Sequence, residues 1–553
     1  MGATEGWSTQ SPIDIYSPQR SEQIKLHERF LRCTIRGNLC DENDLCVQEI
    51  KEAALAETSD PSAASGCESP QPHLKREIGF LDLSLFYVVS GLSLRWIATA
   101  AASGPSSIVV WIFAWIGFFL PLAGCVMELS SRYPQEGGLY IWAQKGLGDF
   151  AGFIAGWTYS MSNLPYFSAV LYFAAGSALF VGGSHGPLLS LASDSSYFMT
   201  FSLVVLGGII VLNIRGVKPG KWLNNVGALG SLIPVLVLLV LGFISWKHAG
   251  SATHFTLAAM VPHASVKNAI FWSTIFFAFG GVECASFMGG EIRNTRRTVP
   301  RALVFAGILI TTGYILGTIA MLVAMPSEQI NGLGGLMTAI AQMCKGLGVS
   351  WMVTGIALMV TLSCVGAAGA YLAACSRLPF LAGIDCYLPA AFGRIHPKWN
   401  TPYVAVLFYG LAGMLFAFLG QAATSVKGAY DVLVSMSVIT YFIPYLFLFA
   451  SMISVQKHPA GPEVIRVPGG KIVAIVLAIM GLITTSITIC LSVLPSDDEP
   501  NKTLAVVKVV GMTIVLLVVG IANYVVGKRR QARSASAQTM MVNAVSMMQN
   551  SPE

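Results

Sequence analysis

Long apolar runs, most of them uncharged, recur along the chain from residue 81 onward and are separated by polar connections. A helix that crosses the hydrocarbon core of a membrane needs about 20 consecutive apolar residues. Five runs reach this length without a charged residue, namely 108–127, 150–181, 302–324, 349–375 and 432–455. Seven weaker runs are adequate, namely 81–103, 197–214, 226–246, 269–290, 402–424, 472–495 and 504–526. The pattern predicts an all-α polytopic membrane protein with about 12 transmembrane helices.

Two of the predicted spans carry a charged residue far from their ends, which is unusual because a charge in the hydrocarbon core is costly. Arg95 lies in the first span and Glu283 in the sixth. Each lies near a glycine-containing soft point, Ser90-Gly91 in the first span and Gly280-Gly281 in the sixth. Glycine weakens a helix by about 1 kcal/mol relative to alanine and permits the backbone to unwind.

The two soft points occupy corresponding places, in the first helix of each predicted five-helix half. Paired interruptions of this kind are typical of transporters built from inverted repeats, where unwound backbone lines a cavity at mid-membrane. The alternative is that the glycines only allow neighbouring helices to pack closely. Their coincidence with the two deep charges favours the first interpretation.

The composition agrees with this division of the chain. Apolar residues make up 54% of the chain and charged residues 11%, against roughly 25% charged in soluble domains, which excludes a soluble enzyme. Residues 1–80 nevertheless hold 21 charges, 8 basic and 13 acidic. We therefore expect a disordered cytoplasmic N-terminal tail over 1–77, a transporter domain over 78–527 and a cytoplasmic C-terminal tail over 528–553.

The basic residues in the connections predict the orientation in the membrane. With the N-terminus inside, the cytoplasmic connections and the C-terminal tail hold 19 Lys and Arg residues, and the opposite connections hold six. This asymmetry predicts cytoplasmic termini in a multi-pass protein of the plasma (inner) membrane. It also accounts for most of the net charge of +6, so the charge does not indicate a nucleic-acid partner.

The spans lack the residues that cofactor chemistry requires. None of the eight histidines lies in a predicted span, whereas haem and metal sites inside a helix bundle need clustered ligands on facing helices. The chain has no Walker A motif, so ATP is not expected to act directly. We expect no cofactor and no enzyme active site.

Three longer segments carry motifs. The end of the second span reads ELSSRYPQEGGLYIW (128–142), the sixth span and its exit read FAFGGVECASFMGGEIRNTRRTVPRA (277–302), and the exit of the eighth reads AACSRLPFLAGIDCYLPAAFGRIHPKWNTP (373–402). In this order, and at predicted cytoplasmic ends, they resemble motifs of the amino acid–polyamine–organocation (APC) superfamily of amino acid permeases. The resemblance covers about residues 78–527.

The resemblance implies a LeuT-like fold, in which two inverted five-helix repeats form the core and two further helices lie beside it. It also implies secondary transport of amino acids or related amines by alternating access, either proton-coupled or by exchange. The partners would be the amino acid or amine substrate, protons and the lipid bilayer. By position, Phe277 matches the aromatic residue that closes over the substrate, and Glu283 matches the acid implicated in gating and proton handling. The unwound backbone of the family is matched by Phe279, Gly280, Gly281 and Val282.

The first span departs from the family pattern. Relatives usually carry a Gly-Ser-Gly-like cradle whose backbone amides hold the substrate carboxylate, and here the stretch reads SGLSLRWI (90–97). Ser90 and Gly91 remain the candidates for a shifted cradle. Arg95 has three interpretations: a built-in cation in place of a coupling ion, a receptor for the substrate carboxylate, or a structural ion pair with Glu283.

Two further alternatives stay open at this stage. Glu283 could load and release a proton during transport, or it could be a fixed acceptor for backbone amides of the interrupted helix. The protein as a whole could be a membrane amino acid sensor (a transceptor) that keeps the binding site and signals through its N-terminal tail.

Overall fold

Helices form the regular structure of the computed structural model, and no strand occurs among the residues that it describes. These residues are 79–133, 137–262, 266–283, 292–376, 387–399, 401–462, 464–495 and 501–549. Ten helical stretches are long and apolar enough to cross a membrane, and each overlaps a predicted span. The protein is therefore an all-helical, multi-pass membrane protein.

The described chain follows the order of the predicted spans. Its first helices are α3 (Phe80–Gly91), α4 (Leu94–Ala102), α5 (Ser106–Ala114), α6 (Leu120–Arg132), α7 (Leu139–Leu147), α8 (Asp149–Met161), α9 (Asn163–Ala178), α10 (Ser195–Arg215), α11 (Val217–Ala249) and α13 (Val266–Phe277). The later helices are α14 (Thr295–Ala324), α15 (Gly335–Gly346), α16 (Met352–Cys375), α17 (Tyr403–Gln421), α18 (Val426–Val455), α19 (Gly470–Ser492) and α20 (Lys502–Gln549). The expected tail after residue 527 is therefore helical as far as Gln549. One compact unit, His73–Arg529, holds the helix bundle, and the expected N-terminal tail lies outside the described residues.

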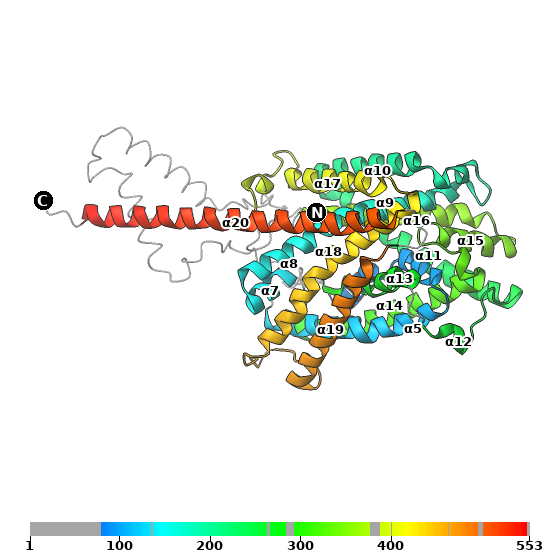
Figure 1. Ribbon diagram of the computed structural model, residues 1–553, viewed down its shortest axis with the longest axis horizontal. Helices are drawn as coiled ribbons and strands as arrows, with labels where there is room; N and C mark the ends of the chain where they lie inside the picture. Colours follow the sequence, from blue (N-terminus) through cyan, green and yellow to red (C-terminus); the bar gives the residue numbers. More distant parts are fainter. Residues whose placement is uncertain are drawn as a thin grey trace, which may run out of the picture. The chain divides into compact units, whose positions relative to one another are not determined.

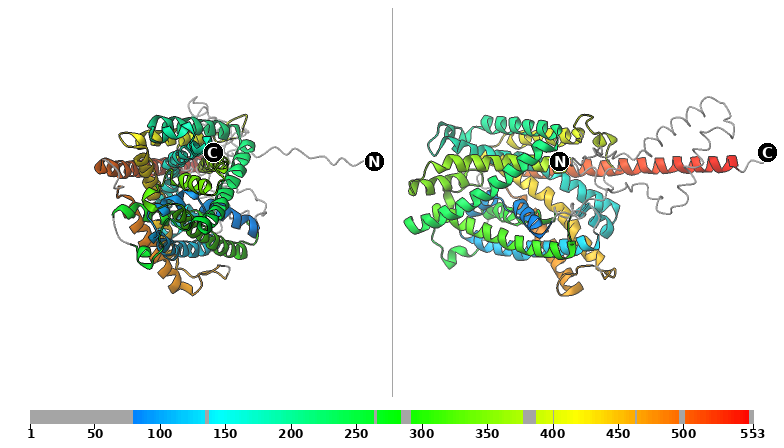
Figure 2. Two further views of the ribbon diagram at one scale, coloured as in Figure 1. Left: turned by 90° about the vertical axis from the view of Figure 1, so that its right-hand side faces the viewer. Right: turned by 180° about the vertical axis from the view of Figure 1, so that it is seen from behind.

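Helix α18 lies in the middle of this bundle. It packs against α7, α8, α9, α13, α17 and α19, and Figure 1 shows it crossing obliquely between α9 and α19. Helix α16 packs against α9 and α11, while α14 packs against α3, α4 and α11. Figure 2 shows the helix bundle from two other directions. The arrangement brings α4, α9, α13, α16 and α18 around one interior region.

The outward faces of the peripheral helices are apolar. Val204 of α10, Leu236 of α11, Ile472 of α19 and Val507 of α20 are all exposed. In water such faces would be unfavourable, whereas in a bilayer they contact lipid tails of similar polarity. The distribution is that of a bundle whose solvent is the membrane.

Some glycines of the spans serve close helix packing, as one of the two interpretations of the soft points allows. A Cβ atom added to Gly307 of α14 would lie 2.4 Å from the ring of Phe119, and one added to Gly410 of α17 would lie 2.4 Å from Ile210 of α10. Small residues at such crossings let helix backbones approach each other.

Neither the first nor the sixth predicted span forms one continuous α-helix among the described residues. The first span consists of two helices, α3 and α4. In the sixth span, helix α13 ends at Phe277. The structure thus confirms both interruptions but shifts them by a few residues. Helix α3 continues through Gly91, and the break falls on Leu92 and Ser93. A glycine only permits a helix to end, and the position of the end depends on which hydrogen-bond partners the freed backbone groups can reach.

The third span has an irregularity that the sequence did not predict. Helix α8 ends at Met161 and α9 begins at Asn163, with Ser162 between them. The side-chain nitrogen of Asn163 donates to the carbonyl oxygens of Tyr159 and Ser160 at 3.1 and 3.3 Å. Such local bonds compete with the helical pattern and bend the chain.

Glu128, near the end of α6, is buried although it lies at the end of a predicted span. Only 2% of it is exposed. Its carboxylate accepts hydrogen bonds from Arg132 at 2.8 Å, from Gln456 Nε2 at 2.6 Å and from the backbone N–H of Val467 at 3.0 Å. The protein's own donors replace water here and join the end of α6 to the end of α18 and the segment before α19.

Candidate functional site

A cavity of about 110 Å³ lies where the interruptions of the first and third spans meet the end of α13. Helices α16 and α18 complete its wall. The lining residues are Gly91, Leu92, Ser93, Arg95, Trp96, Ser162, Asn163, Tyr166, Val170, Phe277, Ala278, Gly280, Gly281, Ser363, Cys364, Ala367, Tyr371, Ser437 and Tyr441. This mixture of aromatic walls with a few polar groups is typical of sites for small molecules.

The break in the first span exposes backbone groups at the cavity. Ser93 has an extended conformation, with φ −128° and ψ 127°. Its N–H donates to the phenol oxygen of Tyr314 at 3.2 Å, and the same phenol donates to the carbonyl oxygen of Gly91. A tyrosine of α14 thereby provides the hydrogen bonds that a continuous helix would have made internally.

The end of α13 unwinds in tight turns. The N–H of Phe279 donates to Phe276 O at 3.2 Å, and that of Gly280 donates to Phe277 O at 2.9 Å. Gly281 has φ +108°, a conformation that favours glycine because it has no Cβ. The chain then turns to Glu283, and the rest of the predicted sixth span, 284–290, lies outside the described residues.

Tyr314 also reaches this second interruption. Its phenol oxygen lies 3.2 Å from the carbonyl oxygen of Ala278, to which it can donate. The ring stacks on Trp111 with centroids 4.3 Å apart and planes 6° from parallel. One buried side chain on α14 therefore contacts the interrupted backbone of both spans.

Glu283 is fully buried and engages three donors. Its Oε2 accepts the N–H of Gly281 at 3.0 Å, and its Oε1 accepts the hydroxyls of Tyr159 at 3.1 Å and Tyr441 at 2.6 Å. The carboxylate therefore accepts a hydrogen bond from a backbone amide of the interrupted helix, as the interpretation of Glu283 as a fixed acceptor requires. It also connects α13 to α8 and α18.

Arg95 is 3% exposed and faces the cavity from α4. Its Cζ lies 3.9 Å from the ring centroid of Trp96 and 5.0 Å from that of Tyr166. Among the described residues, Nε and Nη1 of Arg95 have no hydrogen-bond partner. Among the described residues no ion pair joins Arg95 to Glu283, which was one of the three interpretations of the arginine; the glutamate accepts hydrogen bonds from hydroxyl and amide donors.

The two phenylalanines singled out from the sequence lie in different places. Phe277 lines the cavity and makes edge-to-face contacts with Trp96 and Tyr441, with ring centroids 5.2 and 5.1 Å apart. Phe279 is 1% exposed and packs against Trp111 and Phe119. The side chain of Phe279 therefore belongs to the packed interior and not to the cavity wall.

The structure brings most of the predicted site residues together. Gly91, Arg95, Phe277, Gly280 and Gly281 line the cavity. Ser90 lies in the last turn of α3, and nothing further is described of its side chain. The sequence reasoning missed Tyr314 and Tyr441, although the signal was present: a tyrosine within an apolar span needs a partner for its hydroxyl.

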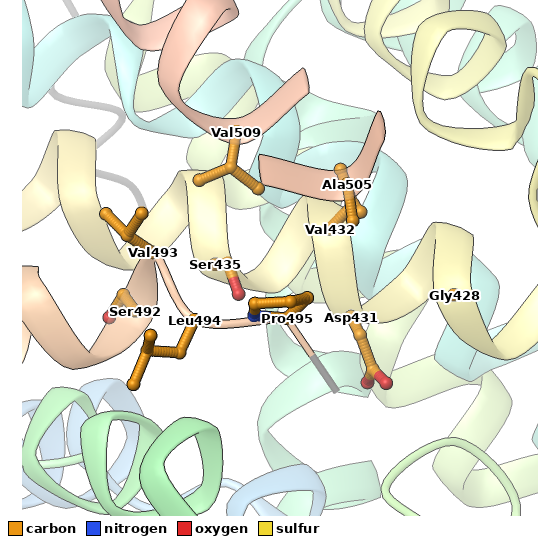
Figure 3. A pocket seen from close by; sticks show the side chains of 10 residues that line it. All are labelled: Gly428, Asp431, Val432, Ser435, Ser492, Val493, Leu494, Pro495, Ala505 and Val509. Atoms are coloured by element: carbon orange, nitrogen blue, oxygen red, sulfur yellow. The ribbon is translucent and has the colours of Figure 1, made fainter. Parts of the chain in front are cut away.

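A second hollow lies between the start of α18, the end of α19 and the start of α20. Figure 3 shows Asp431 and Ser435 of α18 near Pro495, with Ala505 and Val509 of α20 beside them. Its volume of about 20 Å³ is enough for about one water molecule. The central cavity is therefore the better candidate for a substrate.

Comparisons with known proteins show which family the chain resembles. The family model described as amino acid permease matches residues 78–519. An uncharacterized transporter of Legionella pneumophila is 26% identical over 78% of this chain and 92% of its own length. A probable agmatine/putrescine antiporter of Lactococcus lactis is 22% identical over 81% and 94%, and a serine/threonine exchanger of Bacillus subtilis is 25% identical over 70% and 85%.

The family match covers most of the chain and all the residues that line the central cavity. It coincides with the helix bundle, with both interrupted spans and with the three motifs. The chain belongs to the amino acid permease family of the APC superfamily.

Proposed function

We propose that this protein carries amino acids or related amines across the membrane by alternating access, with the central cavity as the substrate site. The observation that carries the proposal is the meeting of two interrupted spans at one buried cavity. Non-helical backbone at membrane depth is tolerated where it lines a cavity, and such sites are typical of secondary transporters. The relatives named as an antiporter and an exchanger support the same class of function.

The proposed architecture is a LeuT-like pair of inverted five-helix repeats followed by α19 and α20. It is supported by the positions of the two interruptions, which lie five spans apart in the predicted order. Both termini are assigned to the cytoplasm of a plasma-membrane protein, because the basic residues gather in the connections on that side. Residues 1–77 and 528–553 are the two cytoplasmic tails.

Phe277 is the proposed closing group of the site. It is the last residue of α13 and precedes the unwound turn at Gly280 and Gly281, so its ring can move with a small change in the backbone. In the described conformation the ring rests on Trp96 and Tyr441 at the cavity wall. Movement away from these rings would open the cavity on one side.

Glu283 is the proposed coupling group, in a proton-coupled cycle or in an exchange cycle. Its carboxylate joins three helices through Tyr159, Tyr441 and Gly281. Protonation would add an O–H donor to one carboxylate oxygen and make that oxygen a weaker acceptor, which would alter the hydrogen bonding among these three partners. A proton on Glu283 would thereby alter the contacts between α13 and its neighbours.

Transport of labelled amino acids and amines into proteoliposomes tests the function. We expect uptake of at least one compound that is accelerated when an unlabelled substrate or a proton gradient is placed across the membrane. Tight binding without flux in the same preparation would favour the sensor. Absence of both binding and flux across an amino acid and amine panel would contradict the proposal.

A further inference from the structure

The charge of the central cavity is unusually one-sided. Arg95 is its cation, and none of the described residues that line the cavity is acidic. Glu283 lies outside that lining, and its oxygens already accept three hydrogen bonds. The cavity therefore holds a buried positive charge that no acidic side chain of its described lining balances, which is an unfavourable arrangement.

The guanidinium of Arg95 is held in a defined orientation. The ring of Trp96 lies 3.9 Å from Cζ, and the ring of Tyr166 lies at 5.0 Å. Aromatic rings attract a guanidinium to their faces, which leaves its N–H groups to point outward in the plane of the group. The side chain is thus positioned before any ligand arrives, so little of its rotamer entropy would be lost on binding.

The donors of this group are available for an anion. Nε and Nη1 have no hydrogen-bond partner among the described residues, although the side chain is 3% exposed. These two atoms lie on different edges of the guanidinium, so a carboxylate that approaches either edge meets one of them. A charge-assisted bond from arginine to a carboxylate would satisfy these donors and neutralise the buried charge.

We infer that Arg95 binds the carboxylate of the substrate, and that the substrate class is therefore small amino acids and not decarboxylated amines. This inference rests on the proposed transport function and assigns its substrate. The uncharged polar groups of Asn163, Ser363 and Ser437 also line the cavity and can accept hydrogen bonds from the ammonium group of an amino acid. An amine without a carboxylate would bring a second positive charge close to Arg95, which is unfavourable at a buried site.

The cavity volume supports the same class. Pockets for drug-sized ligands occupy roughly 300–1,000 Å³, whereas this cavity measures about 110 Å³. A compact amino acid fits such a space better than an extended polyamine. The arginine also stands in the span where the family's glycine cradle is replaced by SGLSLRWI (90–97).

Matched ligand pairs test the inference on the native protein. The purified full-length protein is heated with L-alanine or ethylamine, L-serine or ethanolamine, and L-arginine or agmatine, each pair differing by one carboxylate. A ligand that binds the native state raises the melting temperature. We expect the carboxylate member of at least one small pair to raise it and to compete for uptake in proteoliposomes, while its amine partner does neither.

Substitution of Arg95 tests the role of the residue itself. Arg95→Met should weaken binding of the carboxylate member on the order of 10- to 100-fold, and Arg95→Lys should weaken it less. Arg529→Met, the same change at an exposed arginine of α20, is the matched control and should leave affinity unchanged. If Arg95→Met fails to fold, the ligand pairs on the native protein and Arg95→Lys still decide the question.

The outcomes separate the inference from the proposed function. Uptake of agmatine or ethanolamine without uptake of the carboxylate partners would leave transport standing and overturn the inference. Unchanged affinity in Arg95→Met, together with a new requirement for sodium, would assign Arg95 the place of a coupling cation and would also overturn it. If no member of any pair binds or is transported, the proposed function itself fails.

Discussion

The hydroxyl of Tyr314 donates a hydrogen bond to the carbonyl oxygen of Gly91, the last residue of α3. The phenol oxygen of Tyr314 also accepts the N–H of Ser93 at 3.2 Å and lies 3.2 Å from the carbonyl oxygen of Ala278. A phenol has a single proton, so Tyr314 can donate to only one of the two carbonyls at a time. The two interrupted spans therefore share one donor.

Removal of this hydroxyl should impair transport more than folding. Tyr314→Phe leaves the carbonyl of Gly91 and the amide of Ser93 without their partner, and we expect the free energy of unfolding to fall by about 1–3 kcal/mol. Uptake per molecule of folded protein should fall further, because the break at the substrate site loses its fixed geometry. Thermal denaturation and proteoliposome uptake measure the two effects.

Tyr172→Phe provides the matched control for this change. Tyr172 donates to Gln421 Oε1 at 2.9 Å, between α9 and α17, and does not line the cavity. We expect a comparable loss of stability with nearly unchanged uptake. Equal losses of uptake in the two variants would show that Tyr314 has only a structural role.

Phe277 and Phe279 should separate substrate affinity from packing. Phe277→Leu removes the ring from the cavity wall, so we expect substrate affinity to fall about 10-fold, with expression retained. Phe279→Leu changes the packing against Trp111 and Phe119 and should lower the melting temperature while affinity stays the same. Binding titrations and melting curves on both variants check the contrast, and a reversed result would assign Phe277 to the core.

A methyl group at Gly280 should disturb the site through Tyr441. A Cβ added there would lie 2.6 Å from Cε1 of Tyr441 and 3.2 Å from the carbonyl oxygen of Phe277. The tyrosine ring would have to move, and its hydrogen bond to Glu283 would move with it. We expect Gly280→Ala to lose about 1–3 kcal/mol of stability and at least tenfold of transport.

Gly355→Ala is the control for this substitution. Gly355 lies in α16, and a Cβ added there meets nothing within 4 Å. Since alanine is the better helix former, stability should be equal or slightly higher, and uptake should be unchanged. A loss in Gly355→Ala as large as that in Gly280→Ala would contradict the steric argument.

Glu283 should determine the pH dependence of transport if it carries the proton. Glutamine keeps the size of the side chain but does not titrate, so we expect uptake by Glu283→Gln to become nearly independent of pH. Its amide nitrogen cannot accept a hydrogen bond, so at least one of the three donors loses its partner and the variant should also be less stable. Uptake measured across a pH series gives the answer.

Tyr159→Phe controls for the loss of a hydrogen bond alone. It removes the 3.1 Å bond to Glu283 but keeps the titratable carboxyl group. This variant should keep a pH dependence, whether or not its maximal rate is lower. If Glu283→Gln retained the native pH profile, the glutamate would be only a fixed acceptor.

The spans and their interruptions could be predicted from the sequence because the membrane imposes strong local requirements. The hydrocarbon core demands long apolar runs, and Gly91 and Gly280, each close to a deep charge, marked the two weak points. The pairings between helices could not be predicted in the same way. The partner of Ser93 lies 221 residues further along the chain, and which side chains meet depends on the rotation and depth of each helix.

The same reason explains the two charges. The sequence indicated that Arg95 and Glu283 both need partners, and pairing them with each other was the simplest solution. In the structure aromatic rings surround the arginine, while hydroxyl and amide donors surround the glutamate. The position of Glu128 at the end of a span likewise does not show that Gln456 and Val467 reach it.

The interruption of the first span has a consequence for how the protein is made. Helices α3 and α4 have 12 and 9 residues, so neither is long enough to cross the bilayer alone. The first span must therefore be inserted as one segment during translation, with Arg95 in it at a cost of about 2.5–3.5 kcal/mol. Tyr314, which hydrogen-bonds to the break in the first span, is synthesised only with the seventh span. The hydrogen bonds of Tyr314 to the first break therefore form only after α14 has been made.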